Sequence, residues 1–166
     1  VFSKNEAKIN FENILNKFIK QCSLFWNNYF KNSIRFVKSK VLMQKETKIS
    51  SQKLCDAIVE GMQENKAKDI TIIDLRKISG SVCDFFVICS GESNTQVDGI
   101  CSAIQRHTRK EIQERPWHVE GKNGSEWVLL DYVNVVAHVF GRELREYYDL
   151  EDLWADAKIT RVPDIY

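Results

Sequence analysis

Residues 117–154 read WHVEGKNGSEWVLLDYVNVVAHVFGRELREYYDLEDLW, and this stretch decides the fold. Runs of alternating or β-branched residues within it predict three strands, at residues 117–121, 126–131 and 135–140. The pair Asn123-Gly124 is a strong hairpin signal between the first two strands. Two short helices are predicted to follow, at residues 142–147 and 150–155, with Asp149 as the cap of the second. The stretch is rich in aromatic side chains but lacks the residue clusters that catalysis usually needs. It therefore indicates a protein that acts by contacting another macromolecule.

The residues before this stretch have an equally regular pattern. A helix capped by Ser50 or Ser51 is predicted to run to about residue 65, and a second, capped by Ser93 or Asn94, to run from 95 to 114 before Pro116. Strands are predicted at residues 70–75 and 83–91. The tail after Ala155 is predicted to be unstructured. The order αββαβββα predicts an α/β fold in which a mixed β-sheet packs with helices.

Composition excludes several classes of protein. Apolar residues make up 43% of the 166 residues and charged residues 28%, as in an ordinary globular protein. No apolar run approaches the length of a transmembrane helix. The five cysteines form no CxxC pair, which argues against a zinc site and a disulfide framework and favours free, buried thiols. We therefore expect a cytoplasmic protein that needs no cofactor or metal.

Charge divides the chain at about Met43. Residues 1–42 contain eight Lys/Arg and two Asp/Glu and carry a formal charge of +6, whereas residues 43–166 carry −5. The first segment is interpreted as a leader from a start site assigned too early, a presequence for a mitochondrion or plastid, or a basic arm that binds RNA. The second is the functional domain. Because it is acidic, it is expected to dock on a basic protein rather than on RNA phosphates.

The order of elements, with a set of short motifs, resembles the Iojap family, also called the ribosomal silencing factor family. The resemblance covers about residues 50–156. The motifs that carry it are CDFFVICSGESNTQV at 83–97, HVEG at 118–121, Glu126-Trp127, Asp131, His138-Val139-Phe140 and YDLE at 148–151 with Trp154. One position departs from it: Val133-Asn134 stands where the family commonly has Gly-Asp. Since Val is disfavoured at positive φ, we expect a differently shaped or wider turn there, which puts the placement of Tyr132 in doubt.

The resemblance implies a nucleotidyltransferase-like fold without transferase activity. It also implies binding to the large ribosomal subunit through the fourteenth ribosomal protein of that subunit. This contact would block association with the small subunit and repress translation. Organelle relatives imply the alternative role of a large-subunit assembly factor, and an uncovered sheet edge leaves room for a homodimer.

An active nucleotidyltransferase is the alternative from another class. It requires a Gly-Ser turn for phosphate and two or three carboxylates that hold magnesium beside it. Gly80-Ser81 is present, but the following strand offers Asp84 as its one acid, and Asp131 lies on another strand. We therefore predict no catalytic residues. His138 lies in an apolar strand, and a hydrogen bond from its ring to a backbone carbonyl, Asp84 or Asp131 is expected.

Trp127 is the residue predicted to bind the partner. It alternates with Val128 and Leu130, so if these two face the helices, Trp127 projects from the opposite sheet face, which few predicted helices cover. The alternative is that Trp127 is a core residue. The predicted partner-binding set, which includes an acidic rim suited to a basic protein, is Trp127, Leu129, Asp131, Tyr132, Glu120 and Glu126.

Overall fold

A computed structural model describes residues 49–81 and 83–165, and the fold is that of this part of the chain. The predicted boundary at Met43 lies outside the described residues. The interpretations of residues 1–42 as a leader, a presequence or an RNA-binding arm also concern residues outside this part of the chain.

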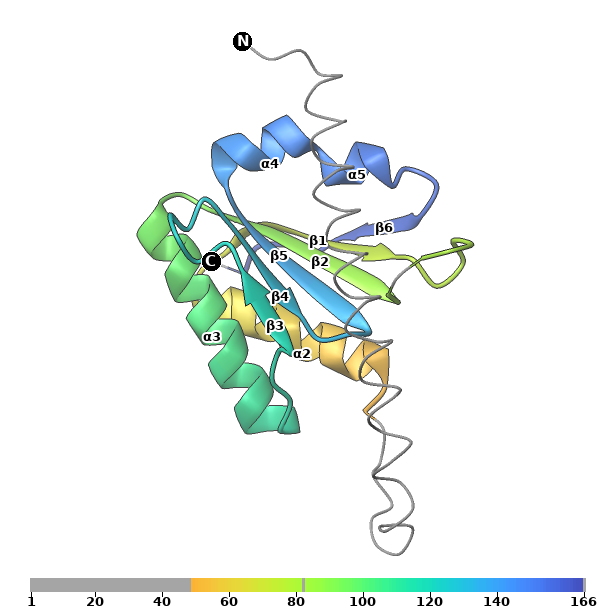
Figure 1. Ribbon diagram of the computed structural model, residues 1–166, viewed down its shortest axis with the longest axis horizontal. Coiled ribbons are helices and arrows are strands. Elements are labelled where there is room, and N and C mark those ends of the chain that lie inside the picture. Colours follow the sequence, from red (N-terminus) through yellow and green to blue (C-terminus); the bar gives the residue numbers. More distant parts are fainter. Residues whose placement is uncertain (1–48, 82, 166) are drawn as a thin grey trace, which may run out of the picture. The chain divides into compact units, whose positions relative to one another are not determined.

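Helices and strands follow one another largely as the sequence predicts (Figure 1). Their bounds are α2 (Ser51–Glu64), β1 (Lys68–Asp74), β2 (Phe85–Gly91), α3 (Asn94–Ile112), β3 (His118–Glu120), β4 (Trp127–Asp131), β5 (Val135–Gly141), α4 (Arg142–Tyr148), α5 (Leu150–Leu153) and β6 (Lys158–Arg161). The strands form one sheet in the order β3-β4-β5-β2-β1-β6. The pair β2–β5 is parallel and the neighbouring pairs are antiparallel. The predicted α/β fold with a mixed β-sheet is confirmed.

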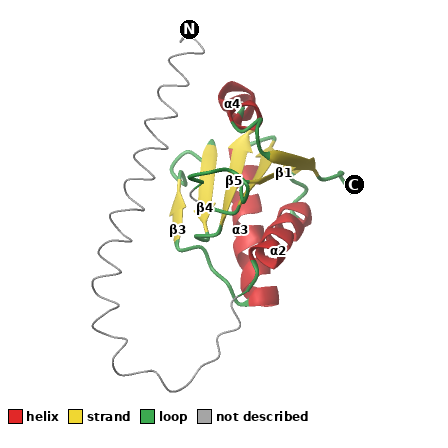
Figure 2. Cartoon of the chain, turned by 90° about the vertical axis from the view of Figure 1, so that its right-hand side faces the viewer, coloured by secondary structure: helices red, strands yellow, loops and turns green. Residues whose placement is uncertain are grey.

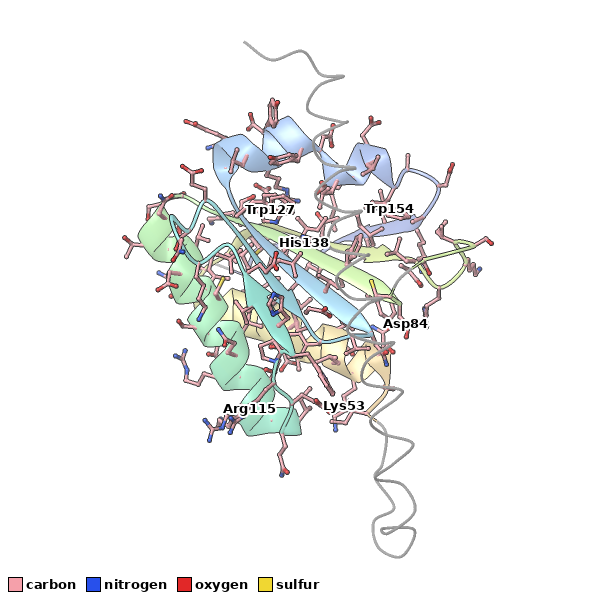
Figure 3. The ribbon with its side chains drawn as sticks, viewed as in Figure 1. Lys53, Asp84, Arg115, Trp127, His138 and Trp154 are labelled. Carbon is pink, nitrogen blue, oxygen red and sulfur yellow. The ribbon has the colours of Figure 1, made fainter. Side chains whose placement is uncertain are left out.

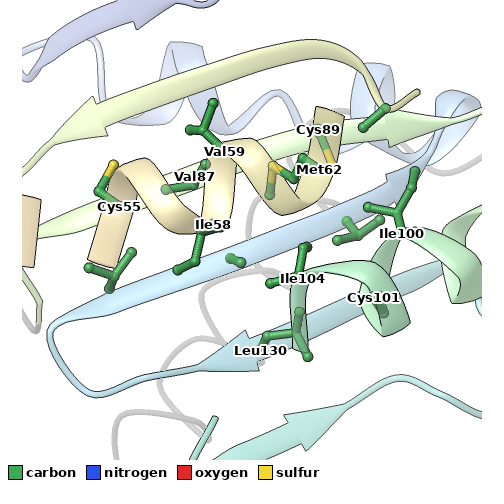
Figure 4. Packing of buried hydrophobic residues seen from close by; sticks show 14 of the residues in the cluster. Cys55, Ile58, Val59, Met62, Val87, Cys89, Ile100, Cys101, Ile104 and Leu130 are labelled. Atoms are coloured by element: carbon green, nitrogen blue, oxygen red, sulfur yellow. The ribbon is translucent and has the colours of Figure 1, made fainter. Parts of the chain in front are cut away.

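The two long helices cover one face of the sheet and form the main core with it. Ser50 and Ser93 cap them, as predicted: each hydroxyl accepts a hydrogen bond from a backbone N–H in the first turn. Apolar residues of α2 and α3 pack against the sheet. Ile58 of α2, Ile104 of α3 and Leu130 of β4 belong to this core (Figure 4). This core fixes which side chains of each strand point away from the helices.

The opposite face is covered more fully than the sequence indicates. Figures 1 and 2 show α4 on the other side of the sheet from α2 and α3. Leu150 is buried, and the Trp154 ring packs edge-on against Phe86 at 5.8 Å. The expectation that few helices cover this face is therefore wrong for the central strands. Tyr148, Leu150 and Trp154 belong to this cover, whereas Tyr147 is exposed.

The sequence predicts an unstructured tail after Ala155. This prediction is wrong, because β6 in the tail pairs with the edge of β1. Its four residues are all exposed and include a single apolar side chain, Ile159. Such a strand has no burial pattern to detect, and its order depends on the backbone groups that β1 offers. The local sequence therefore could not predict that residues 158–161 pair with β1.

The turn between β4 and β5 places Val133 at φ 74°, in the left-handed region that β-branched residues disfavour. The turn is tight rather than widened, since the Tyr132 N–H donates to the Val135 carbonyl at 2.9 Å. The Asp131 carboxylate also accepts the Val133 N–H at 2.7 Å. Local hydrogen bonds thus hold Val133 in a strained conformation.

Candidate partner-binding surface

Trp127 lies on the face of the sheet opposite α2 and α3, as alternation predicts (Figure 3). Val128 and Leu130 are fully buried toward the helices, whereas Trp127 is half-buried. The interpretation of Trp127 as a residue of the main core is therefore wrong. The indole is nevertheless not bare.

Three aromatic side chains hold the indole in place. Its ring stacks on Phe140 from β5, with centroids 4.9 Å apart and an interplanar angle of 17°. Tyr148 from α4 packs on it at 5.0 Å. The indole Nε1–H donates to His138 Nδ1 at 3.4 Å. These contacts restrict the rotamer of Trp127, so little side-chain entropy remains to be lost when a partner covers its open side.

The part of this face nearest the β3 edge is open. Glu120 of β3 lies opposite Leu129 of β4, and their side chains share the face of Trp127. Leu129 is half-buried and Glu120 is exposed. His118, also exposed, places its Nε2 2.8 Å from a Glu120 carboxylate oxygen. We call these four residues, Trp127, Leu129, Glu120 and His118, the Trp127 surface.

Two residues predicted to bind the partner contribute differently. Tyr132 is only 5% exposed, and its hydroxyl lies 3.0 Å from Thr108 Oγ1 of α3, on the helix side of the sheet. Burial raises the pKa of Tyr132 to about 12. Asp131 is 9% exposed, and it uses one carboxylate oxygen to fix the turn at Val133. Tyr132 is therefore a core residue and the Asp131 carboxylate holds a turn, so neither side chain joins the exposed residues beside Trp127.

Glu126 is exposed immediately before β4. It is one position out of phase with Trp127 and Leu129, so alternation does not place its side chain on their face. Its backbone carbonyl accepts a hydrogen bond from Gly141 N–H at 2.6 Å. Of the predicted acidic rim, Glu120 is the exposed member on this face, whereas Asp131 lies in phase with Trp127 but is buried.

His138 lies beneath the indole and is 2% exposed. Burial lowers its pKa to about 3, so the ring is neutral at physiological pH. Its Nε2 has no hydrogen-bond partner among the described residues. The predicted bond to a carbonyl, Asp84 or Asp131 is wrong. The indole N–H takes the place of that partner, and Asp84 accepts instead from the Ser51 hydroxyl.

Side chains that could bind a metal ion or act as nucleophiles are dispersed over the described residues. No group of three His, Cys, Asp or Glu side chains in this part of the chain is placed to hold a metal ion. Cys55, Cys83, Cys89 and Cys101 are free and buried, as predicted, whereas Cys22 lies outside the described residues. Burial raises the pKa of Cys55, Cys83 and Cys101 to about 12, so these thiols remain protonated and unreactive.

The aromatic support beneath Trp127 was not predicted from the sequence. Phe140 and His138 share its sheet face because residues of β5 alternate, and their pairing with Trp127 and Leu129 follows from the β4–β5 register. This signal was available from the short connection predicted between the strands at 126–131 and 135–140. The contact of Tyr148 from α4 with Trp127 depends on tertiary packing, so no local sequence pattern predicts it.

Comparison with known proteins adds an independent line of evidence. Residues 48–165 match the family model described as "Ribosomal silencing factor during starvation". The chain is 36% identical to the ribosomal silencing factor of Halalkalibacterium halodurans over 70% of this chain and 98% of that protein. It is 29% identical to the chloroplastic protein Iojap of Zea mays over 64% of this chain, which corresponds to 46% of the maize protein.

Solved structures agree with the sequence matches. A crystal structure of a Chromobacterium violaceum protein superimposes with a TM-score of 0.61 at 30% identity, covering 70% of this chain and 97% of that one. A Bacillus halodurans protein gives a TM-score of 0.56 at 32% identity, covering 68% of this chain and 98% of that one. Among the described residues, no helix combines the length and apolar character needed to cross a membrane.

Proposed function

The chain belongs to the family of ribosomal silencing factors, and on that premise we propose that it represses translation by binding the large ribosomal subunit through the Trp127 surface. The contact blocks association with the small subunit by occupying the joining face. The partner within the large subunit is its fourteenth ribosomal protein, which the family resemblance implies. No chemical step is required, because the bound domain is itself the obstacle.

The observation that carries this proposal is a supported, half-buried indole beside Leu129, both on β4, which is the neighbour of the edge strand β3. Aromatic residues held rigidly in a small apolar patch are typical anchors of protein interfaces, and each contributes about 2–4 kcal/mol when it fills a pocket. Glu120 adds negative charge at the edge of the patch, which complements a basic ribosomal protein. Since α4 covers one side of the indole, the partner approaches from the β3 side.

The dispersed carboxylates support a role without catalysis. Asp84 accepts a hydrogen bond from Ser51, and Asp131 accepts one from the Val133 N–H. Asp84 and Asp131, the two acids considered as magnesium ligands, are thus both used in hydrogen bonds within the fold. We expect no magnesium-dependent binding of ATP in isothermal titration calorimetry, and tight binding that requires magnesium would contradict this part of the proposal.

Assembly of the large subunit is the second candidate. The chain is 29% identical to a mouse protein named "Mitochondrial assembly of ribosomal large subunit protein 1" over 60% of this chain and 44% of that protein. The same contact would then act on precursor particles. Depleting the chain in its own cells distinguishes the roles: accumulation of large-subunit precursors supports assembly, whereas unrestrained joining of mature subunits supports silencing.

Cosedimentation with isolated large subunits tests the docking contact. Trp127→Ala is expected to weaken binding at least tenfold, or about 1.4 kcal/mol. Trp154→Ala is the matched control, because it removes an indole that packs on Phe86 of the same sheet face, away from the Trp127 surface. Equal binding by both variants, within about threefold of the unmodified chain, would exclude Trp127 as the anchor.

A further inference from the structure

A groove with a concentration of positive charge lies between the C-terminal half of α3 and the edge strand β3. Its volume is about 600 Å³, and it is separate from the Trp127 surface. The lining comes from three successive pieces of chain: α3, the connection that follows it, and β3. The residues are Gln105, Arg106, Arg109, Lys110, Arg115, Pro116 and Val119.

The cations of this groove are only partly neutralised. Arg106 pairs with Glu64 at 3.3 Å, and Lys110 pairs with its neighbour Glu111 at 2.9 Å. Within residues 49–81 and 83–165, neither Arg109 nor Arg115 has a carboxylate oxygen within 4.0 Å. Residues 43–166 carry a formal charge of −5, so this local excess of positive charge runs against the balance of the domain.

Stabilisation of the helix explains only part of the cluster. Arg109 and Lys110 lie in the last turn of α3, where cations interact favourably with the helix dipole. Arg115 lies beyond the helix end, after Gln113 in the left-handed conformation, so the dipole does not account for it. Pro116 restricts the backbone beside Arg115, and Figure 3 places Arg115 at the C-terminal end of α3.

An exposed aromatic side chain follows the groove directly. Trp117 is 62% exposed, and its backbone N–H donates to the Asp131 carbonyl at 2.7 Å, which fixes its main chain to β4. Bases of unpaired nucleic acid stack on such rings, while neighbouring Arg and Lys side chains neutralise the phosphates. Acidic polypeptides would use the cations but would gain little from a stacking platform.

From this juxtaposition we infer that the groove formed by Arg106, Arg109, Lys110 and Arg115 binds the phosphate backbone of an unpaired RNA segment, with one base stacked on Trp117. The inference goes beyond the proposed docking contact and does not depend on it. The expectation that the acidic domain avoids RNA is thereby restricted to the rest of its surface.

Fluorescence anisotropy with a labelled, unstructured RNA of about 12 nucleotides tests the inference on the full chain. Combined Arg109→Ala and Arg115→Ala is expected to weaken binding at least tenfold and to reduce the slope of log affinity against log salt by about 1.4. The control is combined Arg142→Ala and Lys158→Ala, which removes the same charge from α4 and β6. It is expected to change affinity less than about twofold. Every variant retains residues 1–42, so their contribution cancels.

Trp117→Ala separates RNA from an acidic polypeptide. It is expected to weaken RNA binding at least about fivefold while leaving the salt slope unchanged, because stacking involves no counterion release. Polyglutamate is expected to compete poorly with the RNA. Groove and control variants that bind alike, an absence of RNA binding, or effective competition by polyglutamate with no effect of Trp117→Ala would each overturn the inference. Ribosomal subunits are absent from the assay, and Trp127→Ala is expected to bind the RNA normally, so a failure here is distinct from a failure of the docking proposal.

Discussion

His138 contributes a pH dependence to stability because burial lowers its pKa from 6.5 to about 3. Below pH 6.5, His138 binds a proton in the unfolded chain but stays neutral in the folded chain. The free energy of unfolding therefore decreases as the pH falls toward 3. Above pH 6.5 both states are neutral and this contribution is zero.

Replacing His138 with a side chain that does not titrate removes this dependence. Between pH 7 and pH 5, the unmodified chain is expected to lose about 2 kcal/mol more unfolding free energy than His138→Gln. Urea denaturation of both proteins at the two pH values measures the difference. Equal losses would show that His138 is protonated in the folded protein.

Val133 is a second residue whose effect has a predictable sign. At φ 74° a β-branched side chain is strained, whereas Gly adopts this conformation freely. Val133→Gly is therefore expected to raise the unfolding free energy by about 1 kcal/mol, since the side chain is exposed and little packing is lost. Val119→Gly in β3 is the control and is expected to lower it, because Val119 is half-buried in a strand. A destabilising Val133→Gly would mean that side-chain packing outweighs the strain.

Single residues also mark the limit of what the sequence predicts. The face of Trp127 followed from alternation with Val128 and Leu130. The same alternation, carried on to Tyr132, places Tyr132 with Val128 and Leu130 on the helix side, where its hydroxyl meets Thr108 of α3. The prediction that Tyr132 joins Trp127 departed from this pattern. Nothing in the local sequence showed that the Asp131 carboxylate would be used by the turn.

Among the elements, the β3–β4 hairpin is the one that presents the docking residues, and Gly121 allows it to close. A Cβ on Gly121 would lie 1.9 Å from the Trp127 carbonyl oxygen, whereas one on Gly124 would meet no atom within 4 Å. Both glycines have positive φ, so the two substitutions to Ala share the conformational cost and differ in the clash.

Gly121→Ala is therefore expected to lower the unfolding free energy at least about 2 kcal/mol more than Gly124→Ala. Urea denaturation measures this difference, and hydrogen exchange should show β3 and β4 losing protection in Gly121→Ala alone. Equal stability of the two variants would contradict the close approach of Gly121 to Trp127.

Predictability differed among the elements for physical reasons. The long helices and buried strands were predicted because burial on one face or both produces a clear apolar pattern. The Asn123-Gly124 signal correctly predicted a hairpin, although β3 ends at Glu120 and β4 begins at Trp127, a wider loop than a two-residue turn. β6 was missed because an exposed edge strand is specified by its neighbour.

At the scale of the whole domain, β3 separates two surfaces of opposite character. Its residues alternate, so Glu120 belongs to the Trp127 surface while Val119 lines the basic groove. One face of the edge strand thus suits a basic protein and the other an RNA strand. A large ribosomal subunit presents both kinds of partner.

We propose that the Trp127 surface, when docked, prevents the subunits from joining. Light scattering after mixing small subunits with large subunits preincubated with the chain measures this directly. The unmodified chain is expected to reduce joining, and Leu129→Glu, which places a charge on the surface, is expected to restore it. The exposed control Asp98→Lys is expected to inhibit like the unmodified chain. Undiminished inhibition by Leu129→Glu would show that the block acts through another surface.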